Sequence, residues 1–314
     1  MDVLVVPQRD VIELLDTDAL IDRLADGFAA LSGGQMNVPP RNMVPTEHGA
    51  VLAMPAWGPG LPVGVKLVSV FHGNHARGLP SHIAMIYLAD ADTGVPIAIM
   101  DGTHITTMRT AAAAALSARL AARGDARVLA IIGGGVQAHA HLEFMLKVRP
   151  LSEIRVYSPN SAHAALIAAR HPAALVADTA PDAVRGADIV SLCTSATTPV
   201  IEPSWISPGT HVTSVGFAPP GHEMPVELAA NSRVMVESRM AFAPAPAGCV
   251  ELAGLDPQTA AEIGEVVLGV RPGRVNDHEI TVYRSMGHAV EDLVAAQMVY
   301  GAAIASGRGQ LVEL

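Results

Sequence analysis

A glycine-rich turn lies near the middle of the chain, between an apolar run and a helix-like one. Residues 128–145 read VLAIIGGGVQAHAHLEFM, in which Gly133, Gly135 and Ala138 fit the spacing G-x-G-x-x-A. Between a strand and a helix, the first glycine permits a tight turn and the second lets the backbone approach a pyrophosphate. The small third residue lets the helix pack close to the strand. The turn therefore predicts a dinucleotide site, and the alternative is a purely structural strand–helix turn.

The residues that would select the dinucleotide follow the next predicted strand. In folds that prefer NAD, an acidic side chain at this strand end binds the ribose hydroxyls. The strand ends VYSPNS here, so that Ser158 and Asn160 stand where the acid would be. Without that carboxylate a 2'-phosphate is not repelled, and we expect NADP(H) to be favoured over NAD(H).

A lone lysine lies in an apolar segment of the first third of the chain. Lys66 belongs to the run VGVKLVSVF, which is apolar on both faces of a strand, so its ammonium group should be buried. A buried ammonium needs an anionic partner or a lowered pKa. Of the 20 basic residues only Lys66 and Lys147 are lysines, and lysine offers a compact, titratable charge that arginine does not. We expect Lys66 to be functional; an internal salt bridge is the alternative.

Two arginines could join this lysine. Arg109 is expected in the first turn of an alanine-rich helix, where a cation opposes the helix dipole unless an anion is near. Arg41 lies between VPP and NMVP. Three cations that converge without matching acids would bind a substrate carboxylate. The alternatives are pairing of Arg109 with Asp101 or Asp92, and a solvated loop for Arg41.

Composition excludes several classes of function. The net charge is −10 and the sequence has no basic cluster, which argues against a nucleic-acid partner. The N-terminus is a poor signal peptide and no apolar run is long enough to span a bilayer, so we expect a cytoplasmic protein without a membrane partner. Cys193 and Cys249 are not spaced as a metal or redox motif, and the 13 histidines lack a completing cluster. No metal site is predicted.

These residues need two kinds of scaffold. Residues 11–31 have helical periodicity, and short strand-like runs between about 50 and 100 predict an antiparallel meander. A helix should follow, capped by Thr106 or Thr107 and ended by Gly124. From Arg127 onward, nearly continuous apolar strands alternate with helices, which is typical of a parallel sheet.

The last segment predicts a long helix that packs back on the first domain. The fold class is therefore α/β, with a Rossmann dinucleotide-binding domain inserted in an α+β domain. We place the outer domain at residues 1–118 plus 287–314 and the inserted domain at residues 119–286.

Several motifs together resemble the ornithine cyclodeaminase/mu-crystallin family across nearly the whole chain. They are GVKLVSVFHGNHARGLPSH, DADTGVPIAIMDGTHITTMRTAAAAALSARL, LAIIGGGVQAHAHLE, PGTHVTSVG and EITVYRSMGHAVEDL. The resemblance implies an outer domain for substrate binding and dimerisation around a Rossmann insertion, and a homodimer. It implies that Arg41, Lys66 and Arg109 bind the substrate carboxylate and that Lys66 is catalytic. The cofactor-binding residues that we predict are Ser81, Arg109, Thr110, Gly133, Gly135, Val136, Gln137, Ala138, Ser158, Asn160, Thr194, Gly216 and Ser285.

Two departures from the cyclodeaminase pattern suggest which branch of the family this is. Cyclodeaminases have an aspartate soon after the fifth Rossmann strand and a glutamate in an early strand, whereas this chain has Ala218 and Leu52. Both acids that could meet a second ammonium group are missing. The resemblance therefore implies an NAD(P)H-dependent reductase of a ketimine or imino acid, or an amino-acid dehydrogenase, acting on a small carboxylate-bearing substrate. His222 lies just past Ala218 and could supply a proton, but we favour the alternative that it is a surface loop histidine.

Two other functions stay open. A cyclodeaminase would convert ornithine to proline and ammonia with recycled NAD⁺. A non-catalytic, mu-crystallin-like protein would only bind a ligand. Retention of the glycine turn with Lys66 and Arg109 argues for an enzyme.

Overall fold

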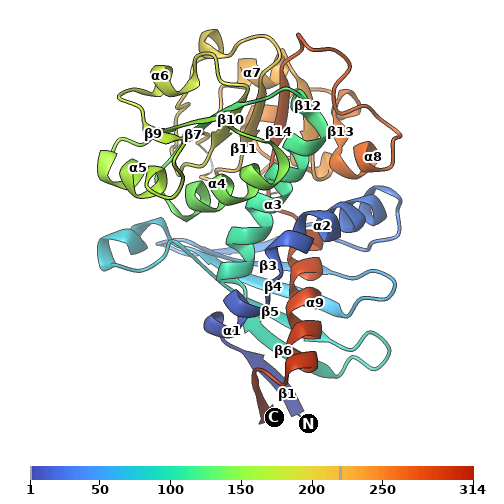
Figure 1. Ribbon diagram of the computed structural model, residues 1–314. Helices are drawn as coiled ribbons and strands as arrows, with labels where there is room; N and C mark the ends of the chain where they lie inside the picture. The colour runs from blue at the N-terminus through green and yellow to red at the C-terminus, as the bar shows by residue number, and fades with distance from the viewer. Residues whose placement is uncertain (1, 219–220, 246) are drawn as a thin grey trace. The chain divides into compact units, whose positions relative to one another are not determined.

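The computed structural model describes residues 2–218, 221–245 and 247–314, which form two compact units (Figure 1). Unit 1 comprises the chain up to Arg109 together with His288–Leu314, and unit 2 comprises Thr110–Gly287. The first boundary lies within a helix, after Arg109, whereas the sequence placed it after residue 118. The motif-bearing residues are thus divided between a discontinuous unit and an inserted one.

Unit 1 is built on a mixed sheet in the order β15-β1-β6-β5-β4-β3-β2. Its strands are β1 (Asp2–Val6), β2 (Asn42–Pro45), β3 (Ala50–Ala56), β4 (Val63–Val70), β5 (His82–Ala89), β6 (Pro96–Asp101) and β15 (Gln310–Glu313). The strands from β2 to β6 form the predicted antiparallel meander. The sequence missed β1 and β15, which pair with each other across the full length of the chain.

Three helices complete unit 1: α1 (Gln8–Leu14), α2 (Thr17–Ser32) and α9 (Ala289–Ser306). Two glycines let α9 approach its neighbours closely. A Cβ on Gly64 of β4 would lie 2.7 Å from Leu293 Cδ1, and one on Gly27 of α2 would lie 2.8 Å from Val294 Cγ2. These small residues bring the first turns of α9 against the side of β4 on which Lys66 lies.

The alanine-rich helix α3 (Thr103–Ala121) begins earlier than the sequence suggested. Thr106 and Thr107 are not its N-cap, because both lie inside it and donate their hydroxyls to Gly102 O and Thr103 O. Asp101 Oδ1 instead accepts the backbone N–H of His104. Arg109 therefore lies beyond the first turn, and the expected opposition to the helix dipole does not apply to it.

Unit 2 contains a parallel sheet of eight strands within its described residues, in the order β13-β12-β14-β11-β10-β7-β8-β9. The strands are β7 (Val128–Ile132), β8 (Glu153–Tyr157), β9 (Ala174–Val176), β10 (Ile189–Leu192), β11 (His211–Ser214), β12 (Arg233–Val236), β13 (Ala261–Glu262) and β14 (Thr281–Arg284). The strand order reverses between β7 and β10, which is where ligands bind in doubly wound sheets. The predicted Rossmann fold is confirmed.

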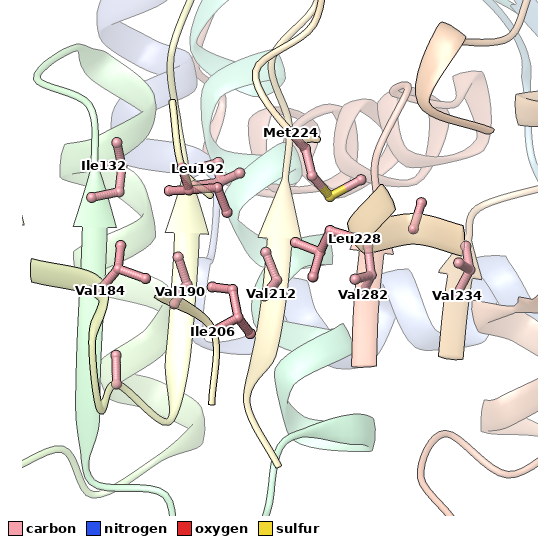
Figure 2. Close-up of a cluster of buried hydrophobic side chains, with 14 of the residues drawn as sticks. Ile132, Val184, Val190, Leu192, Ile206, Val212, Met224, Leu228, Val234 and Val282 are labelled. Atoms are coloured by element: carbon pink, nitrogen blue, oxygen red, sulfur yellow. The ribbon is translucent and has the colours of Figure 1, made fainter. Parts of the chain in front are cut away.

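The remaining helices of unit 2 connect these strands. They are α4 (Val136–Val148), α5 (Ser161–Ala168), α6 (Ala180–Val184), α7 (Val226–Ala230) and α8 (Ile263–Val267), with short 3-10 turns between strands. Figure 2 shows the core on one side of the sheet, where Ile132, Val190, Val212 and Val282 lie on neighbouring strands. Among the described residues, no helix is both long and apolar enough to cross a membrane.

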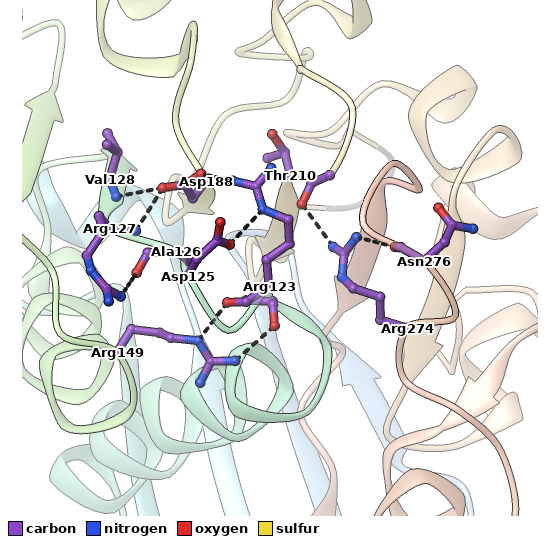
Figure 3. Close-up of polar contacts among 12 residues, drawn as sticks. Arg123, Asp125, Ala126, Arg127, Val128, Arg149, Asp188, Thr210, Arg274 and Asn276 are labelled. Carbon is purple, nitrogen blue, oxygen red and sulfur yellow. Dashed lines mark hydrogen bonds and ion pairs between the residues drawn. The ribbon is translucent and has the colours of Figure 1, made fainter.

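Two arginine side chains contact the C-terminal end of α3 within unit 2, and Figure 3 labels both of them, Arg149 and Arg274. Arg149 Nη2 donates to Ala118 O and Ala122 O, both at 2.9 Å, and Arg274 Nε donates to Ala121 O at 2.7 Å. Ala118 O also accepts the N–H of Ala122, whereas Ala121 O and Ala122 O lie at the helix end, where carbonyls lack an intrahelical donor. The guanidinium groups satisfy these two carbonyls, and their charges complement the helix dipole. The end of α3 is thereby attached to the parallel sheet.

Candidate functional site

The glycine turn between β7 and α4 has the geometry that its sequence predicts. Gly133 has φ +137°, and a Cβ at this position would lie 2.4 Å from Cys193 O at the end of β10. Gly135 is the N-cap of α4, and nothing stands within 4 Å of the place of its Cβ. Ala138 is fully buried. Gly133 therefore makes the tight turn, whereas Gly135 leaves open space in front of the helix N-terminus.

Two observations at this turn fit a bound dinucleotide. The N-terminus of α4 presents backbone N–H groups and a positive dipole end, which suit a pyrophosphate. Gln137 Oε1 is buried and has no hydrogen-bond partner among the described residues. Val136, beside it, is exposed. An open anion site next to an unsatisfied buried amide indicates that these residues are arranged for a ligand.

The position expected to select the cofactor carries no acid. Ser158 follows β8 and lies near the turn, since a Cβ on Gly134 would be 2.7 Å from its Oγ. Asn160 is the N-cap of α5, and its Oδ1 accepts the Ala162 N–H at 3.1 Å. His163 also lines this side of the turn, with its Cβ 2.7 Å from the same place. Hydroxyl, amide and imidazole groups thus surround the end of β8.

Other predicted cofactor residues lie at the carboxyl ends of strands in the same sheet, held by two buried glutamates. Thr194, after β10, donates through its backbone N–H and its hydroxyl to Glu223 Oε2, at 2.7 and 2.8 Å. Gly216, after β11, donates its N–H to Glu223 Oε1 at 2.6 Å. Ser285, after β14, donates its hydroxyl to Glu237 Oε1 at 2.7 Å. The structure therefore brings these residues to one edge of the sheet.

The cation site of unit 1 contains acids that the sequence analysis did not expect. Lys66 Nζ lies 2.6 Å from Asp292 Oδ2, and Arg109 Nε lies 3.0 Å from Asp292 Oδ1. Arg109 Nη1 also lies 3.0 Å from Glu291 Oε2. All four side chains are at most 4% exposed. The expectation of cations without matching acids is wrong for Lys66 and Arg109, and the partners of Arg109 are Glu291 and Asp292 rather than Asp101 or Asp92.

Burial lowers the pKa of Lys66, and its ion pair with Asp292 raises it. Desolvation is the largest influence and lowers its pKa from 10.5 to about 8, whereas Asp292 raises it and Arg109 lowers it further. An ammonium group with this pKa is charged at neutral pH and can still lose its proton. Lys66 therefore has both an anionic partner and a lowered pKa, the two possibilities that the sequence raised.

The structure also describes the other residues that the sequence singled out. Arg41 is half-buried and directly precedes the edge strand β2. Ser81 Oγ lies 3.1 Å from His82 Nδ1 at the start of β5, and Thr110 is buried in α3. Ala218 is buried, and the Nδ1 atom of the half-buried His222 has no hydrogen-bond partner among the described residues.

Sequence reasoning missed the acids that organise both regions. Glu291 and Asp292 lie in the first turn of α9, where acids are common because they complement the helix dipole. Glu223 and Glu237 lie just after strands or in a loop, without a motif of their own. Adjacent acids at a buried helix start, in the quoted segment GHAVEDL, were the one available signal.

Comparison with known proteins identifies the family of the chain. The family model described as ornithine cyclodeaminase/mu-crystallin family matches residues 1–307. The chain belongs to this family. Its relatives include the ketimine reductase mu-crystallin of Mus musculus, which is 36% identical over 282 residues, covering 88% of each chain.

Solved structures of the family are similar over the full length. The Δ¹-pyrroline-2-carboxylate reductase of Thermococcus litoralis, in complex with NADH and L-proline, has a TM-score of 0.94 at 33% identity and covers 98% of this chain and 100% of its own. An archaeal alanine dehydrogenase dimer with bound NAD has a TM-score of 0.91 at 30% identity and covers 100% of both chains. These relatives are reductases and dehydrogenases, in agreement with the predicted oxidoreductase function, and the protein is an enzyme of this family.

Proposed function

We propose that the protein reduces a small imino acid, with a C=N bond next to a carboxylate, at the expense of a nicotinamide dinucleotide, NADPH in preference to NADH. The observation that carries the proposal is the buried Lys66, ion-paired at 2.6 Å and with a pKa of about 8, in a chain that also has an open glycine turn. The bound dinucleotide would supply a hydride to the imine carbon.

The side chains of unit 1 would supply the proton and the binding of the carboxylate. Lys66 Nζ in its ammonium form donates a proton to the imine nitrogen, so that hydride and proton together convert C=N to an amine. Arg109, with Arg41, binds the substrate carboxylate through charge-assisted hydrogen bonds. Unit 1 thereby serves as the substrate domain and unit 2, with the cofactor residues listed above, as the dinucleotide domain.

The preference for NADPH is supported by the end of β8. No carboxylate among Ser158, Asn160 and His163 would repel a 2'-phosphate, and these side chains can donate hydrogen bonds to it.

The early strand argues against cyclodeaminase chemistry. Leu52 pairs with Val68 and Met54 pairs with Lys66, which places Leu52 and Lys66 on the same side of the sheet. The position that carries a glutamate in cyclodeaminases is here a leucine that is 2% exposed. A diamine substrate would find no acid for its second ammonium group at this position.

We also propose that the protein is a homodimer formed through the open side of the unit 1 sheet. Side chains on the side opposite Lys66 are exposed and apolar on neighbouring strands, at Val51, Leu67, Ile83 and Met85. Apolar patches of this kind mark interfaces. The dimer of the archaeal relative supports this proposal.

The first test measures oxidation of NADPH and NADH with cyclic ketimine carboxylates and with pyruvate plus amines. We expect reduction with a higher kcat/KM for NADPH, and a loss of at least about 100-fold in kcat for Lys66→Met, which removes the proton donor. Lys147→Met is the matched control, because it removes the other lysine of the chain, which belongs to unit 2. Release of proline and ammonia from ornithine without net cofactor use would replace the proposal with a cyclodeaminase.

A further inference from the structure

One carboxylate in unit 1 contacts both cations of the candidate site. Asp292 Oδ2 lies 2.6 Å from Lys66 Nζ, and Asp292 Oδ1 lies 3.0 Å from Arg109 Nε. The three groups come from β4, α3 and α9, and each is nearly inaccessible to solvent. The two oxygens of one side chain thus set the separation of an ammonium group and a guanidinium group.

We propose that Asp292 is a positioning residue, which holds Lys66 and Arg109 side by side and keeps Lys66 in the ammonium form that the reduction consumes. This inference rests on the proposed function, because it assigns to Lys66 the proton for the imine nitrogen. It adds a residue that the motif analysis did not single out, and it explains why the lysine of a buried strand keeps its charge.

The electrostatic surroundings of Lys66 support this role. Its strand neighbours at the same level, Met54 on β3 and Ile86 on β5, are apolar, so the charged groups that face it are Asp292, Glu291 and Arg109. Burial and Arg109 lower the pKa of Lys66, while Asp292 is the first of the groups that raise it. Without Asp292 the ammonium group would face a cation in an apolar interior, and it would lose its proton at a lower pH.

The adjacent acid has a different role. Glu291 Oε2 contacts Arg109 Nη1 at 3.0 Å, and its Oε1 accepts the backbone N–H of His288 at 2.6 Å in the capping box of α9. Glu291 therefore attaches Arg109 to a helix end, and its influence on the pKa of Lys66 is the smallest of those named. Asp292 thus contacts both cations, whereas Glu291 contacts Arg109.

The start of α9 suits both acids. Glu291 and Asp292 lie in its first turn, where the positive end of the helix dipole stabilises carboxylates. Gly64 lets this turn pack tightly on β4, as described above. The helix start therefore holds both acids close to the two cations.

The composition of the chain allows a direct test. Since Lys66 and Lys147 are its only lysines, protein grown with lysine labelled with ¹³C at Cε gives two NMR signals, which Lys147→Arg assigns. We expect the Lys66 signal of the wild type to titrate near pH 8. Asp292→Asn should lower this midpoint by about one pH unit or more, as expected for loss of an opposite charge at contact distance. Glu291→Gln, the matched control that removes a charge one residue away, should shift it much less.

Activity provides the second readout. The alkaline limb of the kcat/KM profile should move to lower pH in Asp292→Asn, in parallel with the NMR titration, and kcat should fall at pH 8 while Asp292→Glu recovers part of it. Glu291→Gln should mainly raise KM, because it loosens the arginine that binds the carboxylate. A purely structural role for Asp292 would change stability and leave both pH midpoints unchanged.

A Lys66 midpoint in Asp292→Asn equal to that of the wild type overturns the inference. If Asp292→Asn does not fold, Arg109→Gln decides: loss of the competing cation should raise the Lys66 midpoint, and an unchanged or lower value overturns the inference. If the Lys66 midpoint shifts in Asp292→Asn but the wild type reduces no imine, the positioning role is supported and the proposed function is rejected. If the wild type reduces imines but the midpoint does not shift in Asp292→Asn, the proposed function is supported and the positioning role is rejected.

Discussion

Gly133 and Gly135 have different surroundings, in line with the different roles that the motif gives them. Gly133 has a left-handed φ of +137° and backbone atoms 2.4 Å from the place of a Cβ, whereas Gly135 has φ −96° and open space. The first glycine is thus required by the fold and the second by the space that a ligand would use.

This difference predicts opposite effects of two alanine substitutions. Gly133→Ala should lower the free energy of unfolding by at least about 2 kcal/mol, because strain and overlap with Cys193 O add. Gly135→Ala should leave it within about 1 kcal/mol and weaken dinucleotide affinity. Urea unfolding and NADPH fluorescence titration measure the two effects. Equal stability of the two variants would contradict this account of the turn.

For single residues, the sequence identified functional side chains that are unusual within their own segment. It missed those whose role depends on contacts with distant parts of the chain. Lys66 stood out because a charge in an apolar strand is unusual. Asp292 did not, because it lies more than 200 residues further along and resembles an ordinary acid in a helix start. The alternating pattern of β4 shows on which side of the sheet Lys66 lies, but it does not show which residues Lys66 contacts.

At the scale of elements, periodicity predicted the meander, the parallel strands and the long helices. The errors lie where tertiary contacts decide. The start of α3 was placed too late, because threonines inside a helix resemble caps. Asp101 was considered only as a partner of Arg109 and not as the acceptor at the helix start. Strands β1 and β15 were missed, because each becomes a strand by pairing with a distant segment.

Buried histidine joins α3 to the parallel sheet in unit 2. His211 is fully buried, with Nε2 3.1 Å from Ser117 Oγ and Nδ1 2.8 Å from Thr281 Oγ1. Burial is the largest influence on it and lowers its pKa to about 3, and the positive charges of Arg274 and Arg149 add to this effect. The folded protein therefore holds His211 neutral.

This pKa predicts a loss of stability in acid. The folded-state pKa lies below the usual value near 6.5, so the unfolded chain binds the proton first, and stability present above pH 6.5 is lost as the pH falls. Between pH 7 and pH 5, His211 should account for about 2 kcal/mol of the decrease in unfolding free energy. In His211→Gln this decrease should be smaller by that amount, as measured by urea unfolding at the two pH values. An identical pH dependence in the variant would show that His211 is not held neutral.

At the scale of the whole molecule, the exposed apolar side of the unit 1 sheet predicts assembly. Leu67→Glu should give a protein with the mass of one chain in light scattering, because a buried charge at an interface core is costly. Ile304→Glu, on a still more exposed apolar residue of α9, should leave the mass of two chains. A Leu67→Glu variant that still has twice the chain mass would place the interface elsewhere.

The discontinuity of unit 1 has a consequence for biosynthesis. During translation, Lys66 and Arg109 emerge long before Glu291 and Asp292, with the whole of unit 2 made in between. Domains fold as units during synthesis. The nascent outer unit must therefore wait, with its two cations unneutralised and its β1 edge unpaired, until α9 and β15 leave the ribosome. Insertion of unit 2 thus makes the charge-neutral form of the site one of the last features of the protein to form.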